Sequence, residues 1–140
     1  VHMLLILRKI TCGRTFSLRV IGVGIDIVDL DVFRARLDDG LIEELFLPEE
    51  VKYCSGRARP WESYAARFAA KEATFKALSA GLSQGLRWKH VEILKDESGA
   101  VAVQLTGLAL KQAQEKKVKE IHLSVSHTKL NAMAIVVMEG

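Results

Sequence analysis

Cysteine, proline and aromatic residues are scarce in this chain of 140 residues, and it contains no long apolar run. The two cysteines, Cys12 and Cys54, have no metal-ligand spacing, so we expect reduced thiols in a cytoplasmic protein rather than disulfides. The apolar run from Met3 to Leu7 is far too short to span a bilayer, and no small-residue cleavage site follows it. We therefore expect neither a membrane-spanning segment nor a secretion signal.

Neither sign of charge dominates the sequence. Lys and Arg total 20 and Asp and Glu total 17, which gives a net charge of +3 and a pI of about 9.0. This mild basic excess suggests acidic partners. A nucleic-acid-binding role would rest on the pI alone, because no basic stripe is interleaved with aromatic residues, so we expect no nucleic acid partner. The sequence also has no internal repeat and no Gly-rich phosphate-binding loop.

The composition, with 49% hydrophobic and 26% charged residues, fits one globular domain with a substantial core. We assign this domain to residues 19–140. Residues 1–18 are interpreted as an N-terminal extension to which we assign no chemical role. Within it, Val1 and His2 precede the first methionine and are interpreted as a cloning remnant.

The segment from Pro60 to Ala80 predicts a long central helix. It is rich in good helix formers, begins with a proline suited to the first turn and is followed by Gly81. At helical spacing, one stripe collects Ala65, Phe68, Ala69, Glu72 and Phe75. The Glu72 carboxylate among these apolar groups needs a partner, which is either Lys76 in an ordinary salt bridge or a metal ion.

Alternation of residue types predicts a strand from Val20 to Val28. One face carries Gly22, Gly24 and Asp26, and its glycines allow another backbone or a ligand to approach closely. The other face carries Ile21, Val23, Ile25 and Ile27, and we expect it to lie in the core. A lone aspartate at the end of a strand either forms a cap or turn or binds a ligand, and the pattern leaves both interpretations open.

Hydrophobic periodicity and turn signals predict the remaining elements. They are short helices within residues 31–47, a helical segment from Pro48, a hairpin with strands at 88–94 and 100–105, a helix at 108–119, and closing strands at 121–126 and 132–138. The basic loop before the central helix contains Arg57 and Arg59, which either keep the surface solvated or contact a phosphate.

Three segments carry a more specific signal: Val20–Val28 (VIGVGIDIV), Arg67–Lys76 (RFAAKEATFK) and His122–Thr128 (HLSVSHT). In order and spacing they resemble the holo-[acyl-carrier-protein] synthases, which are small bacterial 4'-phosphopantetheinyl transferases. The resemblance covers residues 20–139, and the Phe-Ala-Ala-Lys-Glu-Ala block is its most specific part.

The resemblance implies a fold, an activity and an assembly. The fold is α+β, with an antiparallel sheet packed on a long central helix. The activity is the Mg²⁺-dependent transfer of the 4'-phosphopantetheine arm of coenzyme A to a serine of an apo acyl carrier protein, with release of adenosine 3',5'-bisphosphate. The carrier belongs to fatty acid or polyketide biosynthesis. The assembly is a homotrimer with active sites between neighbouring subunits.

The resemblance also implies site residues by position. Asp26 and Glu72 match the two carboxylates that hold magnesium, with Glu72 acting as a ligand alone or also as a base. Lys76 matches the lysine near the transferred phosphate. The expected coenzyme A contacts are Arg67, Lys76, Ser79, Gly81, His127 and Thr128, the last two from the adjacent subunit. Arg67 and Lys71 either bind phosphates or remain solvated, and His127 either bonds a phosphate or caps the turn.

The chain departs from the family pattern at three places. Ser79 and Ala80 replace the usual Gly-Thr, and Ser98–Val101 lacks the usual lysine of the hairpin turn, so both affect the expected coenzyme A contacts. The usual basic residue shortly after Asp26 is missing, and we expect Arg34 and Arg36 to dock the acidic carrier protein instead. These departures leave a second function open, namely a non-catalytic module that binds coenzyme A or a carrier protein.

Overall fold

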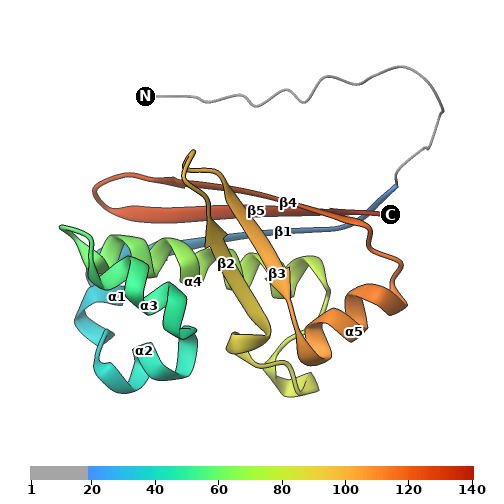
Figure 1. Ribbon diagram of the computed structural model, residues 1–140, viewed down its shortest axis with the longest axis horizontal. Coiled ribbons are helices and arrows are strands. Elements are labelled where there is room, and N and C mark those ends of the chain that lie inside the picture. The colour runs from blue at the N-terminus through green and yellow to red at the C-terminus, as the bar shows by residue number, and fades with distance from the viewer. Residues whose placement is uncertain (1–18) are drawn as a thin grey trace.

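The computed structural model describes residues 19–140 (Figure 1), so the expected extension at residues 1–18 lies outside the described range. The fold is α+β, as the sequence predicts, and none of the described helices is long and apolar enough to cross a membrane. The elements are β1 (Val20–Asp29), α1 (Leu30–Arg36), α2 (Asp39–Leu45), α3 (Pro48–Ser55), α4 (Pro60–Ala77), two 3₁₀ turns (Leu82–Gln84 and Trp88–His90), β2 (Val91–Lys95), β3 (Val101–Leu105), α5 (Gly107–Glu115), β4 (Glu120–His127) and β5 (Asn131–Glu139).

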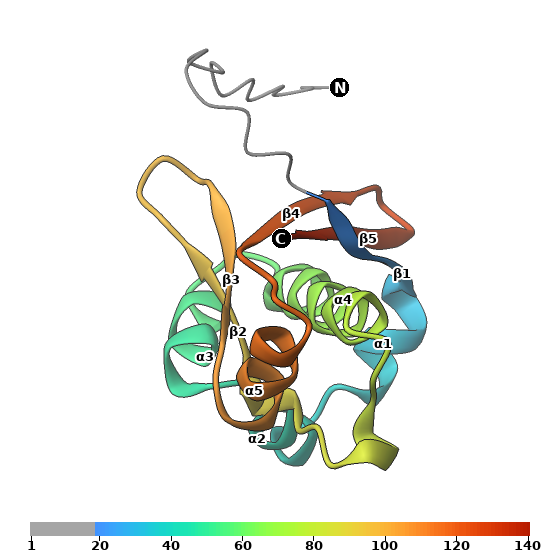
Figure 2. The same cartoon turned by 90° about the vertical axis from the view of Figure 1, so that its right-hand side faces the viewer.

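The strands form two antiparallel sheets around helix α4. The larger sheet has the order β1-β5-β4, with Ile25 opposite Ile135 on one side of β5 and Ser124 opposite Ile135 on the other. Strands β2 and β3 form a separate hairpin. Figure 2 views α4 nearly end-on, with the larger sheet on one side and α1, α3 and the hairpin around the others. Helix α4 is therefore the central element that the sequence predicts.

The two faces of β1 are the reverse of the expected arrangement. Val23, Ile25 and Ile27 are 54%, 54% and 59% exposed, whereas Gly24 and Val28 are buried. The expectation that the isoleucine-rich face lies in the core is therefore wrong within this chain. The face that carries the glycines packs on α4 instead.

Steric limits explain why the glycine face turns inward. A Cβ atom on Gly22 would collide with the carbonyl oxygen of Ala77, and one on Gly24 would collide with that of Ala73. The backbones of β1 and α4 therefore approach more closely than any side chain on this face would permit. Ala73 and Ala77 are themselves fully or almost fully buried at this contact.

The predicted apolar stripe of α4 is confirmed. Ala65, Ala69 and Phe75 are buried, and Phe68 and Glu72 are half-buried. Aromatic rings continue the core beyond the helix, since neighbouring ring centroids in the series Phe33, Phe68, Trp88 and Phe75 lie 5.5, 5.2 and 5.1 Å apart. At these separations aromatic rings attract one another in addition to burying apolar area.

Helix α4 ends at Ala77, three residues earlier than the sequence suggests. The N–H of Ser79 donates to the carbonyl of Lys76, and the N–H of Ala80 donates to that of Phe75. This is the Schellman pattern, which requires a left-handed residue after the cap. Ser79 supplies it with a φ of 53°, a conformation that glycine adopts at a lower energetic cost.

Two other boundaries differ from the sequence expectation by three or more residues, and the rest differ by only one or two. Helix α5 ends at Glu115 because Lys117 has a φ of 62° and the Val118 N–H donates back to the Ala113 carbonyl. The expected strand at 88–94 begins at Val91, since the preceding residues form a 3₁₀ turn.

Cys54 is the cysteine within the described range, and it is free and fully buried. Burial raises the pKa of its thiol to about 11, so the group stays protonated and unreactive near neutral pH. This state agrees with the reduced thiol expected from the sequence.

We predict that Gly24→Ala lowers the free energy of unfolding by about 2–3 kcal/mol, because its methyl group would force β1 away from the α4 backbone. Urea denaturation measures the change. Gly81→Ala is the matched control, since a Cβ there meets no atom within 4 Å and should leave stability unchanged or slightly raised. Equal stability of the wild type and Gly24→Ala would contradict the proposed close packing.

Candidate active site

Asp26, Glu72 and Lys76 line one pocket of about 530 Å³. Asp26 follows Gly22 and Gly24 on the face of β1 that packs against α4, and Glu72 and Lys76 lie one turn apart on that helix. The Lys76 Nζ donates to the Asp26 Oδ1 at 3.0 Å and to the Ile25 carbonyl at 2.9 Å. Residues that are about 50 positions apart in the sequence therefore meet at one site.

The simple salt bridge between Glu72 and Lys76 that the sequence allowed does not form. Lys76 instead pairs with Asp26, and Glu72 has no ion pair within 4.0 Å in the described part of the chain. The Glu72 carboxylate is thus left half-buried without a cationic partner in direct contact.

Electrostatics at Glu72 favour an added cation. Burial raises the pKa of Glu72, the Asp26 carboxylate raises it further, and Lys76 opposes both effects. Two carboxylates that repel each other across an open pocket are a suitable donor set for a divalent ion. The residues present therefore fit the magnesium site that the resemblance implies.

The rest of the pocket is lined by apolar side chains and by three more charged residues, Asp29, Arg36 and Glu44. Phe33, Phe68 and Trp88 line it, together with Leu45 at the end of α2. Apolar groups on one side of the carboxylates lower the local dielectric constant, which strengthens electrostatic interactions within the pocket.

A second pocket, of about 490 Å³, is lined by cationic side chains. They are Arg57, Arg59, Arg67 and Lys95, with His127 at the end of β4. Glu62 is the acidic residue in the lining, and it pairs with Arg59 at 3.3 Å. The net positive charge suits an anion such as phosphate.

Arg67 is the most constrained cation of this second pocket. It is only 6% exposed, and its guanidinium lies 4.2 Å from the centre of the Tyr53 ring. Its buried Nε has no hydrogen-bond partner in the described part of the chain. The neighbouring Lys95 lowers the pKa of Tyr53, and Arg57 and Arg67 act in the same direction. Arg67 thus brings a buried cation with an unpaired donor to the lining of this pocket.

Sequence reasoning missed Lys95 and Tyr53 as members of this second pocket. Neither residue lies in a motif, and the β2–β3 hairpin and α3 bring them beside α4 only in the folded chain. The two loop arginines, for which solvation was the simpler interpretation, also line it.

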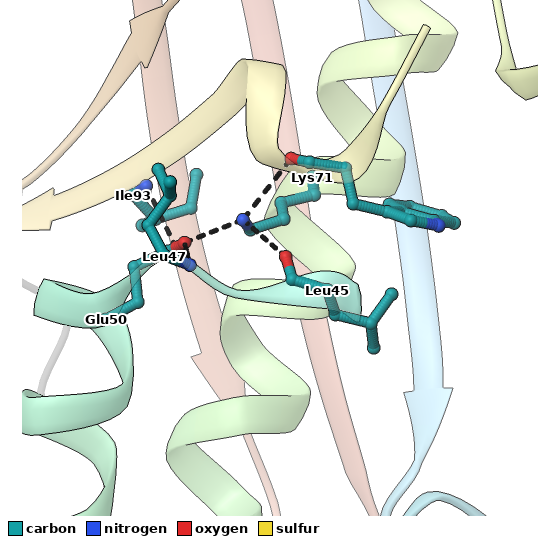
Figure 3. Close-up of polar contacts among 6 residues, drawn as sticks. Leu45, Leu47, Glu50, Lys71 and Ile93 are labelled. Atoms are coloured by element: carbon teal, nitrogen blue, oxygen red, sulfur yellow. Dashed lines mark hydrogen bonds and ion pairs between the residues drawn. The ribbon is translucent and has the colours of Figure 1, made fainter. Parts of the chain in front are cut away.

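Lys71 differs from both interpretations that the sequence allowed. Its side chain is neither solvated nor directed at a phosphate, because it is fully buried and its Nζ lies 2.7 Å from the Glu50 Oε1 (Figure 3). Glu50 is 21 residues away in the sequence, which is why a local pattern does not reveal the pair.

Three other predicted residues lie in turns. Ser79 and Gly81 follow α4, where the Gly81 N–H donates to the Gln84 Oε1 at 3.1 Å. In the β4–β5 turn, the Thr128 Oγ1 accepts from the N–H groups of Leu130 and Asn131 at 3.2 and 3.1 Å. Thr128 rather than His127 therefore caps this turn, and the exposed His127 side chain makes no hydrogen bond within the described residues.

A separate cluster of potential metal ligands comes from β4 and β5. It consists of Glu120, His122 and Glu139, and the His122 Nε2 lies 2.8 Å from the Glu139 Oε2 and 3.5 Å from the Glu120 Oε2. These mostly exposed side chains are already paired with one another, and none of them is a magnesium ligand expected from the sequence.

Comparison with known proteins identifies the family. A model of the 4'-phosphopantetheinyl transferase superfamily matches residues 22–136. Holo-[acyl-carrier-protein] synthases of Geobacter sulfurreducens and Streptomyces avermitilis are 43% and 44% identical to the chain over 123 residues, which cover 86% of this chain and 98% of each relative.

Solved structures agree with the sequence comparison. The holo-ACP-synthase of Plasmodium yoelii has a TM-score of 0.77 at 27% identity, covering 89% of this chain and 98% of that one. The Bacillus anthracis holo-(acyl-carrier-protein) synthase in complex with CoA (3',5'-ADP) has a TM-score of 0.74 at 30% identity, covering 89% and 99%. The resemblance drawn from three short segments is thus confirmed over the whole described domain. The chain belongs to the 4'-phosphopantetheinyl transferase superfamily and, within it, to the holo-[acyl-carrier-protein] synthases.

Proposed function

We propose that this chain transfers the 4'-phosphopantetheine group of coenzyme A to a serine of an apo acyl carrier protein and releases adenosine 3',5'-bisphosphate. The observation that carries this proposal is the meeting of Asp26, Glu72 and Lys76 in one pocket of a chain from this family. Related synthases of Bacillus anthracis and Helicobacter pylori were solved with CoA (3',5'-ADP) and coenzyme A, which supports the same donor here. The buried free thiol of Cys54 is compatible with the cytoplasmic location that we also propose.

Asp26 and Glu72 are proposed to hold a magnesium ion. Magnesium binds few carboxylates and completes its octahedron with waters and phosphate oxygens. The raised pKa of Glu72 supports this role, because a divalent cation would offset its burial and its repulsion from Asp26. When bound, the ion would neutralise charge on the phosphoryl oxygens of coenzyme A.

Lys76 is proposed to bind the phosphate that is transferred. Its side chain is 52% exposed, so exchanging Asp26 for a phosphate oxygen costs little. In the reaction, the serine hydroxyl gives up its proton to a base, which is the Glu72 carboxylate or solvent. The serine oxygen forms a bond to the phosphorus that carries pantetheine, and the bond from that phosphorus to the bridging pyrophosphate oxygen breaks. The Lys76 ammonium would stabilise the negative charge that develops on the phosphates.

The second pocket is proposed to bind other phosphates of coenzyme A through Arg67 and His127. The buried Arg67 Nε without a partner and the excess of cations in the lining support this role. Thr128 keeps its O–H proton available to a phosphate, since its oxygen accepts two backbone bonds. Ser79 and Gly81, in the turn after α4, remain proposed coenzyme contacts.

We further propose that the chain forms a homotrimer whose active sites lie between subunits. Exposed Val23, Ile25 and Ile27 on β1 continue across the sheet into exposed Met133 and Ile135 on β5. Such a contiguous apolar face is typical of an interface. The expected site residues are divided between two pockets, with Asp26 in one and His127 in the other. This division also supports an active site to which one subunit contributes Asp26 and a neighbouring subunit contributes His127.

Arg36 and Arg34 are proposed to dock the carrier protein. Arg36 lines the pocket that contains Glu72, so a docked carrier would present its serine close to the proposed magnesium ligands. Arg34 is exposed, and its guanidinium lies 3.7 Å from the centre of the Trp61 ring, which holds the cation at the surface beside α4.

The direct test incubates the protein with coenzyme A, Mg²⁺ and an apo acyl carrier protein and detects the phosphopantetheine adduct by intact mass. We expect Glu72→Gln and Asp26→Asn to lower the rate by about 100-fold or more, a magnitude seen when one group that stabilises transition-state charge is lost. Glu43→Gln, on the exposed side of α2, is the control. Binding of coenzyme A without any adduct on several carriers would favour a non-catalytic module, and full activity of either variant would refute the magnesium assignment.

Glu72→Gln should also stabilise the metal-free protein near neutral pH. The folded-state pKa of Glu72 is raised, so its contribution to stability is greatest below the unfolded pKa of about 4.3 and is lost as pH rises through the folded value. Glutamine does not ionise, so the Glu72→Gln variant does not lose this stability as the pH rises. Thermal unfolding in EDTA should therefore show a higher Tm for the variant at pH 7 and convergence at acidic pH, and a lower Tm at pH 7 would contradict the repulsion at Glu72.

The trimer is tested by Ile25→Glu, which introduces a charge into the exposed apolar face of the sheet. Analytical ultracentrifugation should find the wild type at three times its chain mass of 15.5 kDa and the folded variant as a monomer. Leu110→Glu, at an exposed apolar position on α5, should remain trimeric. A monomeric wild type, or a trimeric Ile25→Glu variant, would overturn the assembly.

Carrier docking is tested by surface plasmon resonance at low salt. Arg36→Glu should weaken carrier binding by about tenfold, mainly through a slower association rate, because electrostatic attraction acts on the encounter. Arg34→Glu should act in the same direction, whereas Lys111→Glu on the exposed face of α5 should have no effect. Unchanged affinity in both arginine variants would refute this docking surface.

A further inference from the structure

A fully buried ion pair joins α4 to the segments opposite the large sheet (Figure 3). The Lys71 Nζ donates to the Glu50 Oε1 at 2.7 Å, to the Leu45 carbonyl at 2.8 Å and to the Trp88 carbonyl at 3.4 Å. The Glu50 carboxylate in turn accepts from the N–H groups of Leu47 at 3.0 Å and Ile93 at 3.2 Å. Both charges are therefore satisfied without water.

The two carbonyls that Lys71 holds belong to walls of the catalytic pocket. Leu45 and Trp88 both line the pocket of Glu72, and the Trp88 ring lies 5.2 Å from Phe68, another lining residue. Lys71 immediately precedes Glu72 on α4. One ammonium group therefore connects two backbone segments of the pocket lining to the helix that carries the proposed magnesium ligand.

We propose that Lys71 and Glu50 are positioning residues for the transfer reaction: their buried pair fixes the rotation of α4 and the spacing of the Leu45 and Trp88 walls, and thereby aims Glu72 at Asp26. This proposal rests on the proposed function. Neither residue touches substrate. Replacing a residue that orients a metal ligand without itself touching the metal typically lowers metal affinity or activity by 10- to 100-fold.

A role in stability alone explains this arrangement less well. Burying two charges costs much of what their attraction gains, and neutral replacements of a buried pair are often as stable as the original. The pair additionally fixes the orientation of the Lys71 side chain, because its ammonium group donates to three acceptors from three different segments. If the pair serves stability alone, a folded neutral double variant should keep its activity. If the pair positions Glu72, that variant should lose activity and metal affinity.

The test compares the wild type with the double variant Lys71→Met/Glu50→Gln, which leaves no buried charge unpaired. Glu49→Gln/Lys89→Met carries the same replacements at exposed positions and is the matched control. Circular dichroism and urea unfolding establish folding, isothermal titration calorimetry measures the affinity for Mn²⁺ in the presence of coenzyme A, and steady-state assays separate kcat from KM.

For a folded double variant we expect kcat and the Mn²⁺ affinity each to fall by about 10- to 100-fold, with KM for coenzyme A changed by less than about threefold. Wild-type kcat and Mn²⁺ affinity in that variant would overturn the positioning role. If the double variant does not fold, Glu50→Asp decides, because it keeps the charge but draws the carboxylate back by one methylene. It should show the same losses, and wild-type values would overturn the proposal.

The two readouts also distinguish this proposal from the proposed function. A wild type that binds Mn²⁺ with coenzyme A but transfers nothing would refute the function, while the effect of the double variant on Mn²⁺ affinity would still test positioning. An active wild type whose double variant keeps both properties would refute positioning alone.

Discussion

The contact between the glycine face of β1 and the backbone of α4 is the constraint on which the rest of the structure depends. Gly22 and Gly24 lie one strand repeat apart, and Ala77 and Ala73 lie about one helical turn apart, so the two spacings of roughly 6–7 Å match. The next residue on the same face of β1 is Asp26, which this match brings to the turn of α4 that carries Glu72 and Lys76. Asp26 can reach this turn because Gly22 and Gly24, which precede it on the same face of β1, have no side chains.

The same helix uses two lysines in opposite ways, and burial separates their roles. Lys71 is fully buried with Glu50, where leaving either charge unpaired would be costly. Lys76 is half-exposed beside Asp26, where an ion pair is worth little and its partner can be exchanged. The first arrangement suits a fixed support, and the second suits the proposed exchange of Asp26 for a phosphate oxygen.

The sequence predicts the parts of the molecule that depend on local pattern. The central helix, its apolar stripe and the positions of Asp26, Glu72 and Lys76 follow from helix propensity, spacing and motif. The orientation of β1 does not follow from local pattern. Alternation alone assigns the larger apolar side chains to the core, and only the close approach of α4 reverses this assignment. The partner of Lys71 and the lining of the cationic pocket depend on contacts between distant segments, which no local pattern encodes.

We propose that close packing of β1 on α4 creates one divalent cation site between Asp26 and Glu72. Anomalous diffraction from crystals grown with Mn²⁺ and coenzyme A tests it most directly. We expect an anomalous peak between these two carboxylates, with the Lys76 Nζ moved from Asp26 to a phosphate oxygen. A peak at Glu120, His122 and Glu139 with none between Asp26 and Glu72 would contradict it.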